Sequence, residues 1–381
     1  MSAPVRLRPD LEFVRELKAH GGQDVKRCFQ CATCSVVCEL APAARPFPRK
    51  EMLWAQWGLK DRLLADPDVF LCYGCNDCSA RCPRGAHPGD LLAAVRAAVY
   101  RHYAVPSFLG AALARPWALP LLLAVPVLVL MGLLALQHGQ LSHVTTLLAR
   151  PGVRYADFLK HGLLEMLFIG GNVLVFGGAL VGFARFWAAL RRAVPSPRRM
   201  SFGRAVIDTV REIIGHRRFT ECGANRPRRL PHVLVLFGFV GAMATAGLAL
   251  LFMLVWEARH PGLRFAGLDL ASPIKWLGVA SGLAMLVGSG LMIGRGLRSA
   301  EAVGAAGYAD RLFRYVIAAV ALTGVGTWVL RLLDVPALAY PTYFVHLVLV
   351  FFLLWTMPYG KFAHMIYRAL ALVWARQQGR F

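Results

Sequence analysis

Two cysteine runs near the start of the chain constrain its fold more than any other feature. Both runs have the spacing C-x2-C-x2-C-x3-C. Thiolate is the ligand that iron–sulfur centres select, and in runs of this kind the fourth cysteine ligates the cluster of the other run. The sequence therefore predicts two [4Fe–4S] clusters with crossed ligand sets. The first set is Cys28, Cys31, Cys34 and Cys82, and the second is Cys72, Cys75, Cys78 and Cys38.

Zinc and disulfide bonds are the alternative uses for these eight cysteines. Structural zinc takes two C-x2-4-C pairs, not three cysteines at x2 steps. Disulfides need an oxidising compartment and a small stapled fold. The first 30 residues carry charges throughout and lack the apolar core of a signal peptide. We therefore expect reduced cysteines in a cytoplasmic domain.

Composition divides the 381 residues unevenly. Residues 1–105 are polar and hold eight of the nine cysteines, which indicates a ferredoxin-like domain followed by a linker over 106–116. Beyond the linker, apolar runs of 18 or more residues are candidate membrane spans. We expect six of them, over 117–137, 162–187, 232–256, 273–295, 312–333 and 342–366. The expected fold is mainly α: a helical two-cluster domain followed by a six-helix, cytochrome b-type membrane bundle over 117–381.

The basic residues behind the net charge of +22 lie mostly in the loops between the spans. The loop over 188–230 carries eleven arginines, whereas the loops over 138–161 and 257–272 carry three and two Lys or Arg residues. Because basic residues mark the cytoplasmic side of a membrane protein, we expect a multi-pass protein of the cell inner membrane with both termini in the cytoplasm. A nucleic-acid partner is not expected, since its basic residues would gather on one soluble face. The ninth cysteine, Cys222, lies in the long loop and has no predicted ligand role.

Two histidines in the last predicted span favour haem binding. His346 and His364 are eighteen residues apart, which is five turns of a continuous helix with both rings on one face. Their separation along the axis is roughly 27 Å, near the ~30 Å hydrocarbon thickness of a bilayer. Two stacked haems need an axial imidazole near each membrane surface, so the pair predicts haem b, with two haems expected. Interfacial histidines that bond to lipid headgroups are the alternative.

Two family resemblances support these assignments. The stretch WGLKDRLLADPDVFLCYGCNDCSARCPRGAHPGD resembles the C subunit of heterodisulfide reductases, over roughly residues 10–103. The last span, with HLVL, Pro358, Lys361 and the second histidine, is similar to the haem-bearing helix of the nitrate reductase gamma subunit. That resemblance implies that His232 and His364 hold the inner haem.

The sequence departs from the gamma-subunit pattern at Ala242, where that family has another histidine. The partner of His346 for an outer haem is therefore open. His161 is the first candidate, His143 the second, and His138 and His260 follow. A protein with only the inner haem also remains open.

The whole chain resembles the C subunit of the quinone-interacting membrane-bound oxidoreductase (Qmo), which is similar to a fusion of the C and E subunits of heterodisulfide reductase. This implies an electron-transfer subunit that reacts with menaquinone or ubiquinone and binds cytoplasmic subunits with flavin and clusters. It further implies exchange with adenylylsulfate reductase in dissimilatory sulfur metabolism. Glu165, one turn after His161, is the candidate for proton exchange with the quinone.

Three other functions are compatible with the same residues. The first is the equivalent subunit of a heterodisulfide- or sulfite-reductase-linked complex. The second is a haem-free membrane anchor for a ferredoxin module. The third is a redox sensor, which the sequence disfavours because no output domain is recognisable.

Overall fold

The computed structural model describes residues 7–41, 46–139, 141–193, 199–216, 219, 223–260, 268–269, 271–298 and 307–380. Helices make up most of these residues, and none of them forms a β-strand. The expected mainly α fold is therefore confirmed over the described part of the chain. Cys222 lies outside it.

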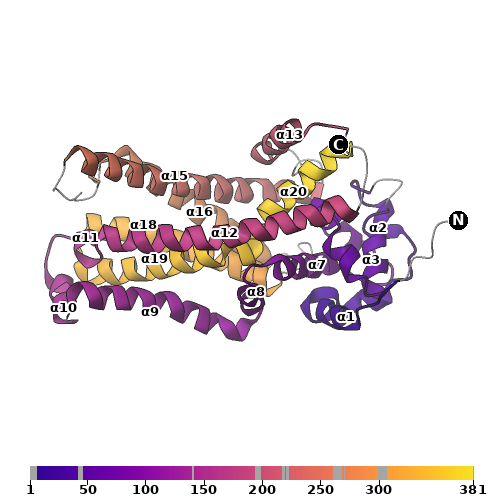
Figure 1. Ribbon diagram of the computed structural model, residues 1–381, viewed down its shortest axis with the longest axis horizontal. Coiled ribbons are helices and arrows are strands. Elements are labelled where there is room, and N and C mark those ends of the chain that lie inside the picture. The colour runs from indigo at the N-terminus through magenta and orange to yellow at the C-terminus, as the bar shows by residue number, and fades with distance from the viewer. Residues whose placement is uncertain are drawn as a thin grey trace.

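Short helices surround the two cysteine loops of the N-terminal domain (Figure 1). They are α1 (Leu11–Leu17), η1 (Lys18–Gly22), η2 (Gln23–Arg27), α2 (Thr33–Val36), α3 (Arg49–Gln56), α4 (Lys60–Leu64), α5 (Asp68–Leu71), α6 (Asp77–Ala80) and α7 (Pro88–Tyr103). The longest of them, α7, buries Leu91, Leu92, Val95 and Val99 almost completely. This apolar stripe at helical spacing makes α7 the centre of the domain's core.

In the part of the chain that the structure describes, six helices are long and apolar enough to cross a membrane, over Pro116–His138, Gly162–Ala193, Arg226–Arg259, Pro273–Leu297, Tyr308–Leu332 and Pro336–Tyr359. They form a bundle with the N-terminal domain at one end (Figure 1). The helices are α9 (Leu119–His138), α12 (His161–Ala193), α15 (Arg229–Arg259), α16 (Pro273–Arg298), α18 (Tyr308–Leu332) and α19 (Pro336–Thr356). Leu128, Met166 and Leu174 on the outside of the bundle are 69–77% exposed. Such an apolar surface suits lipid rather than water, as expected of a multi-pass membrane protein.

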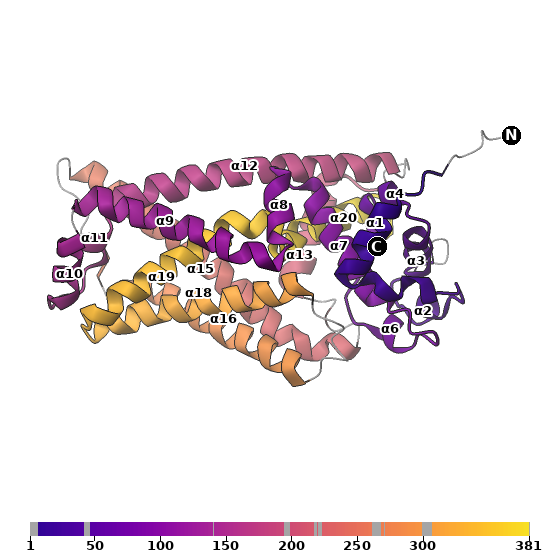
Figure 2. The same cartoon turned by 90° about the horizontal axis from the view of Figure 1, so that it is seen from below.

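Shorter helices connect the spans. Those before the second span are α8 (Ser107–Leu113), η3 (Pro116–Ala118), α10 (Leu141–Ala149) and α11 (Tyr155–Phe158). Those after it are α13 (Phe202–Gly215), η4 (Gly223–Arg228), η5 (Met357–Tyr359), η6 (Lys361–Ala363) and α20 (His364–Gln377). In two perpendicular views, α10 and α11 lie at the end of the bundle opposite the cysteine loops (Figures 1 and 2).

The last span differs from its expected range. The sequence predicts one helix over 342–366, but α19 ends at Thr356, and η5 and η6 separate it from α20. Pro358 has no backbone N–H with which to continue α19, and Gly360 is extended, with φ −121° and ψ −157°. The five-turn relation between His346 and His364 is therefore wrong, because His364 begins a new helix just beyond the span.

Helix α20 packs into the N-terminal domain. One hydrophobic core joins residues of α5 and α7 with Phe186 of α12 and with Tyr367 and Trp374 of α20. The Tyr367 ring stacks on Phe70 at 5.3 Å between centroids and contacts Phe186 edge-on at 4.9 Å. The C-terminal helix thus attaches the cluster domain to one end of the bundle, a contact that the predicted boundary at residue 105 does not anticipate.

Two glycines let the second span approach the linker. A Cβ added at Gly178 would collide with the carbonyl oxygen of Val105, and one at Gly182 with that of Tyr103. The chain leaving α7 therefore runs directly against α12, which limits how far the cluster domain can move relative to the bundle.

Candidate iron–sulfur and haem sites

The two cysteine loops repeat one local backbone. Gln30 and Gly74, each two residues after the first cysteine of its run, have φ of 60° and 62°. Ala32 and Asn76, each four residues after that cysteine, have φ of 68° and 69°. Each loop then enters a four-residue helix, α2 or α6, and these two helices pack together (Figure 2). Positive φ is uncommon outside glycine. Its recurrence at matching positions indicates that both loops fold around the same kind of group.

The thiols fall into two electrostatic groups. Burial raises the pKa of Cys34 to about 11, and the neighbours that raise it further are Cys28, Cys31 and Cys82. Burial likewise raises the pKa of Cys38 to about 11, and its cysteine neighbours are Cys72 and Cys75. Cys78 interacts first with Cys72 and Cys75, and more weakly with Cys34. Thus the last cysteine of each run lies with the other run, as a crossed ligand set requires.

Hydrogen bonds reach the sulfur atoms of both runs. The backbone N–H of Gly74 donates to Cys72 Sγ over 3.3 Å, and that of Ala86 donates to Cys82 Sγ over 3.4 Å. The Gln30 side chain donates to Cys28 Sγ over 3.4 Å. Such donors stabilise thiolates and tune the potential of an iron–sulfur cluster. Eight thiols in two groups, with donors to their sulfur atoms, fit two [4Fe–4S] clusters.

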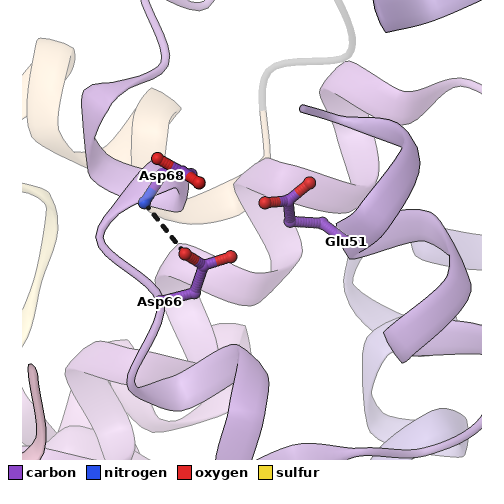
Figure 3. A group of neighbouring side chains, drawn as sticks. All are labelled: Glu51, Asp66 and Asp68. Carbon is purple, nitrogen blue, oxygen red and sulfur yellow. Dashed lines mark hydrogen bonds between the residues drawn. The ribbon is translucent and has the colours of Figure 1, made fainter. Parts of the chain in front are cut away.

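Three buried carboxylates lie together: Glu51 of α3, Asp68 of α5, and Asp66 just before α5 (Figure 3). The ammonium of Lys50 lies 2.8–3.0 Å from an oxygen of each of them and so takes the position that a metal ion would need. Burial raises the pKa of Glu51 well above its ordinary value, and also that of Asp66. Although burial opposes it, Lys50 and Arg380 lower the pKa of Asp68. Arg380, which follows α20, forms a salt bridge with Asp68. This charge cluster is therefore a second contact between the C-terminal segment and the cluster domain.

The predicted inner haem ligands lie at the end of the bundle nearest the cluster domain. His232 Nδ1 shares a 3.1 Å hydrogen bond with His216 Nε2, and His364 Nδ1 donates to the carbonyl of Lys361. No described residue forms a hydrogen bond with Nε2 of either His232 or His364. Haem- and metal-ligating histidines have this arrangement, in which one ring nitrogen is held and the other binds the metal.

The surroundings of these two rings fit a haem b. Phe362 of η6 packs with Phe239 of α15 and Phe313 of α18 in an apolar cluster directly before α20. Lys361 and Arg368 lie close enough to interact electrostatically with both histidines. Apolar walls suit a porphyrin and cations suit its propionates. The residues therefore provide two imidazoles, an apolar lining and counter-charges.

The outer site is described only in part. His346 Nδ1 and Thr323 Oγ1 of α18 are 3.0 Å apart, and a Cβ at Gly324 would lie 2.9 Å from His346 Cε1. His161 begins α12, but its side chain and that of His143 lie outside the described residues. The pairing of His346 therefore stays a prediction.

The other predicted outer residues have protein contacts. His138 is 3.0 Å from the carbonyl oxygen of Phe158, and the His260 ring stacks on Trp256. Glu165 is half-buried in α12, at the predicted outer end of that span. These contacts suit structural histidines, so His161 and His143 remain ahead of them as candidate ligands, and the role of Glu165 in proton exchange stays a proposal.

Sequence reasoning assigned no role to His216. This residue follows α13 with a left-handed backbone (φ 47°), is 5% exposed, and its ring contacts those of His232 and Phe219. A buried polar side chain needs a partner, and its partner here is the predicted haem ligand. His216 lies in an arginine-rich loop without a regular apolar pattern, so the sequence does not predict this contact.

Comparison with known proteins identifies the N-terminal domain. Residues 24–86 match the 4Fe-4S dicluster domain. The C subunit of the H2:CoB-CoM heterodisulfide,ferredoxin reductase of Methanothermobacter marburgensis is 38% identical over 90 residues, which are 23% of this chain and 47% of that protein. A protein of Archaeoglobus profundus that is named as similar to the C subunit of heterodisulfide reductase is 34% identical over 97 residues, 25% of this chain and 50% of that protein. The chain thus spans about half the length of these relatives.

These findings define the class of the protein. Its N-terminal part is a 4Fe-4S dicluster domain similar to the C subunit of heterodisulfide reductase, and in the described residues this domain is joined to a bundle of six apolar helices. Over the full length, citrate utilization protein B of Escherichia coli is similar, with 27% identity across 100% of this chain and 96% of that protein. No solved structure matches.

Proposed function

We propose that the chain is the membrane subunit of a quinone-linked oxidoreductase complex, and that it moves electrons between the quinone pool and cytoplasmic flavoprotein subunits. Its carriers are haem b, at His232 with His364 and at His346 with an outer partner, and the two [4Fe–4S] clusters. Both termini belong on the cytoplasmic side. The cluster domain, α20 and α13, which belongs to the basic loop over 188–230, lie at the same end of the bundle (Figure 1).

The observation that supports this function best is the place of the inner histidine pair. His364 begins α20, which packs into the core of the cluster domain, while His232 lies in the third span. An electron carrier between these helices is therefore adjacent to the carriers of the cluster domain. A ferredoxin module that is merely tethered to a membrane has no need of two half-buried imidazoles at that junction whose Nε2 atoms form no hydrogen bond with a described residue.

The protein's own residues position the carriers and exclude water. Haem and iron–sulfur clusters supply one-electron transfer when bound, and a flavin partner combines two such electrons. His216 and the Lys361 carbonyl orient the inner imidazoles. Glu165 is the proposed acceptor or donor for the protons of a quinol. The outer apolar surface of the spans allows a quinone to reach the bundle from the lipid.

Two partner assignments follow from different similarities. The likeness to the C subunit of heterodisulfide reductase favours a partner of the sulfur-metabolism class, with adenylylsulfate reductase as the resemblance implies and a heterodisulfide or sulfite reductase as variants. The full-length likeness to citrate utilization protein B favours a partner that takes part in the utilization of citrate. The electron-transfer role of this chain is the same in both cases.

The test is anaerobic mixing of the purified full-length protein with a reduced menaquinol or ubiquinol analogue in detergent. We expect the haem absorption to change to that of the reduced form first, followed by the electron paramagnetic resonance (EPR) signals of reduced clusters. A protein that contains clusters but no haem would contradict the proposal and support the haem-free anchor. Co-purification of the native complex, followed by assays with adenylylsulfate and with citrate-related acids, separates the two partner assignments.

A further inference from the structure

An arginine lies about one helical turn from each predicted inner haem ligand, and both arginines bind the same cysteine loop. Arg368 follows His364 by four residues in α20, and its guanidinium donates to the carbonyls of Phe70 and Cys72 over 3.1 and 3.0 Å. The same guanidinium lies 5.5 Å from the centre of the Tyr73 ring. Residues four apart on a helix lie side by side. The second loop is therefore held directly beside His364.

The third span makes the matching contact. Arg228 precedes His232 by four residues, and its guanidinium donates to the carbonyl of Gly74 over 2.7 Å. Arg228 also interacts electrostatically with Cys75. The second loop is thus held by Arg368 of α20, which begins at His364, and by Arg228, the residue directly before α15, which bears His232.

The first cysteine loop has a different environment. Residues of the cluster domain itself donate hydrogen bonds to it: Gln56 donates to the carbonyl of Cys28 over 2.9 Å, and Arg49 donates to Gln30 Oε1 over 3.3 Å. Phe29 and Val36 beside it are 68% and 83% exposed. The first loop therefore faces away from the bundle, toward the surface available to cytoplasmic partners.

We propose that the cluster on Cys72, Cys75, Cys78 and Cys38 exchanges electrons with the inner haem, and that Arg228 and Arg368 are positioning residues that hold this cluster against the haem. The cluster on Cys28, Cys31, Cys34 and Cys82 is then the outer carrier that faces the partner subunits. This order of carriers rests on the proposed function. One electron passes at each step, from haem iron to the second-loop cluster and then to the first-loop cluster, or in reverse.

The positive charge around the second loop is expected to change the reduction potential of its cluster. Arg96 donates to the carbonyl of Val69 and interacts electrostatically with Cys72, and Arg228 and Arg368 add two further cations at the same loop. Positive charge and hydrogen-bond donors beside an iron–sulfur cluster raise its reduction potential, because they stabilise the added electron. Removing Arg228 or Arg368 is therefore expected to lower the potential of the second-loop cluster and leave that of the first-loop cluster unchanged.

The experiment compares Arg368→Gln and Arg228→Gln with Arg84→Gln in the full-length protein. Arg84 is a matched control because its guanidinium lies 4.2 Å from the centre of the Phe29 ring, in the first loop. EPR-monitored redox titration measures the reduction potential of each cluster. Rapid mixing of the oxidised protein with a reduced quinol analogue measures the rate at which each cluster is reduced after the haem. The second-loop cluster is identified as the one whose signal is lost in Cys75→Ala, because Cys75 belongs to that cluster whether the fourth ligands are crossed or not.

We expect Arg368→Gln and Arg228→Gln to shift the second-loop cluster to lower potential and to slow its equilibration with haem, while Arg84→Gln shifts only the other cluster. A shift of the first-loop cluster by Arg368→Gln, or no shift of either cluster, would overturn the proposal. If Arg368→Gln fails to assemble clusters, Arg228→Gln and the charge-conserving Arg368→Lys decide the question. A wild-type protein without haem refutes the proposed function instead, and the cluster potentials still test the role of the arginines.

Discussion

Replacing His364 with alanine is expected to abolish the inner haem and to leave both iron–sulfur clusters in place. The imidazole is one of only two proposed ligands to that haem iron, and alanine offers no replacement. His364 is not among the cysteine loops, so cluster assembly does not depend on it. The measurement is the haem content by the pyridine haemochrome assay, together with cluster iron, in the variant and the wild type.

The matched control for this substitution is His20→Ala. His20 is exposed in the cluster domain, where its ring bonds to the carbonyl of Glu16, so its loss should change neither cofactor. His232→Ala should have the same effect as His364→Ala, because these two residues are the proposed ligands of one haem iron. Survival of the full haem content in His364→Ala would show that the proposed pairing is wrong.

The crossed cluster ligands are tested by two double variants. Cys38 and Cys72 belong to the same predicted cluster, so Cys38→Ala with Cys72→Ala should remove one cluster and keep about four cluster irons per chain. Cys38 and Cys28 belong to different clusters, so Cys38→Ala with Cys28→Ala should damage both. The measurement is non-haem iron together with EPR of the reduced proteins.

Uncrossed ligation reverses the two outcomes. In that arrangement Cys28 and Cys38 serve one cluster, and the pair Cys28→Ala and Cys38→Ala would retain the other. The double variants therefore distinguish the arrangements even if single alanine variants keep a three-iron remnant. The electrostatic grouping of Cys34 with Cys82, and of Cys38 with Cys72, favours the crossed result.

The features that the sequence predicts well are those with a local pattern. Cysteine spacing indicates the two loops because a cluster needs several thiolates from one tight turn. Apolar length indicates the spans because each must satisfy its own backbone across the bilayer. The break after Thr356 also has a local signal, since the sequence Pro358-Tyr359-Gly360 is typical of a helix end. The continuous-helix interpretation of His346 and His364 gave that signal too little weight.

The features that sequence reasoning missed are contacts between distant segments. Arg368 reaches Cys72, and Arg228 reaches Gly74, through hydrogen bonds to backbone carbonyls. Every residue has a backbone carbonyl that can accept such a bond, so the bond does not restrict which amino acid stands at the acceptor position. The packing of Tyr367 on Phe70 likewise depends on how α20 folds back after the last span. Only the three-dimensional arrangement places the second cysteine loop beside the inner histidines.

The central claim is that one chain holds haem b and two iron–sulfur clusters. The most direct measurement is the cofactor content of the purified full-length protein, from non-haem iron analysis and a dithionite-reduced minus oxidised spectrum. We predict about eight cluster irons per chain together with the absorption bands of a reduced b-type haem. Cluster iron at this level without any haem band would contradict the claim and leave a membrane-anchored ferredoxin module.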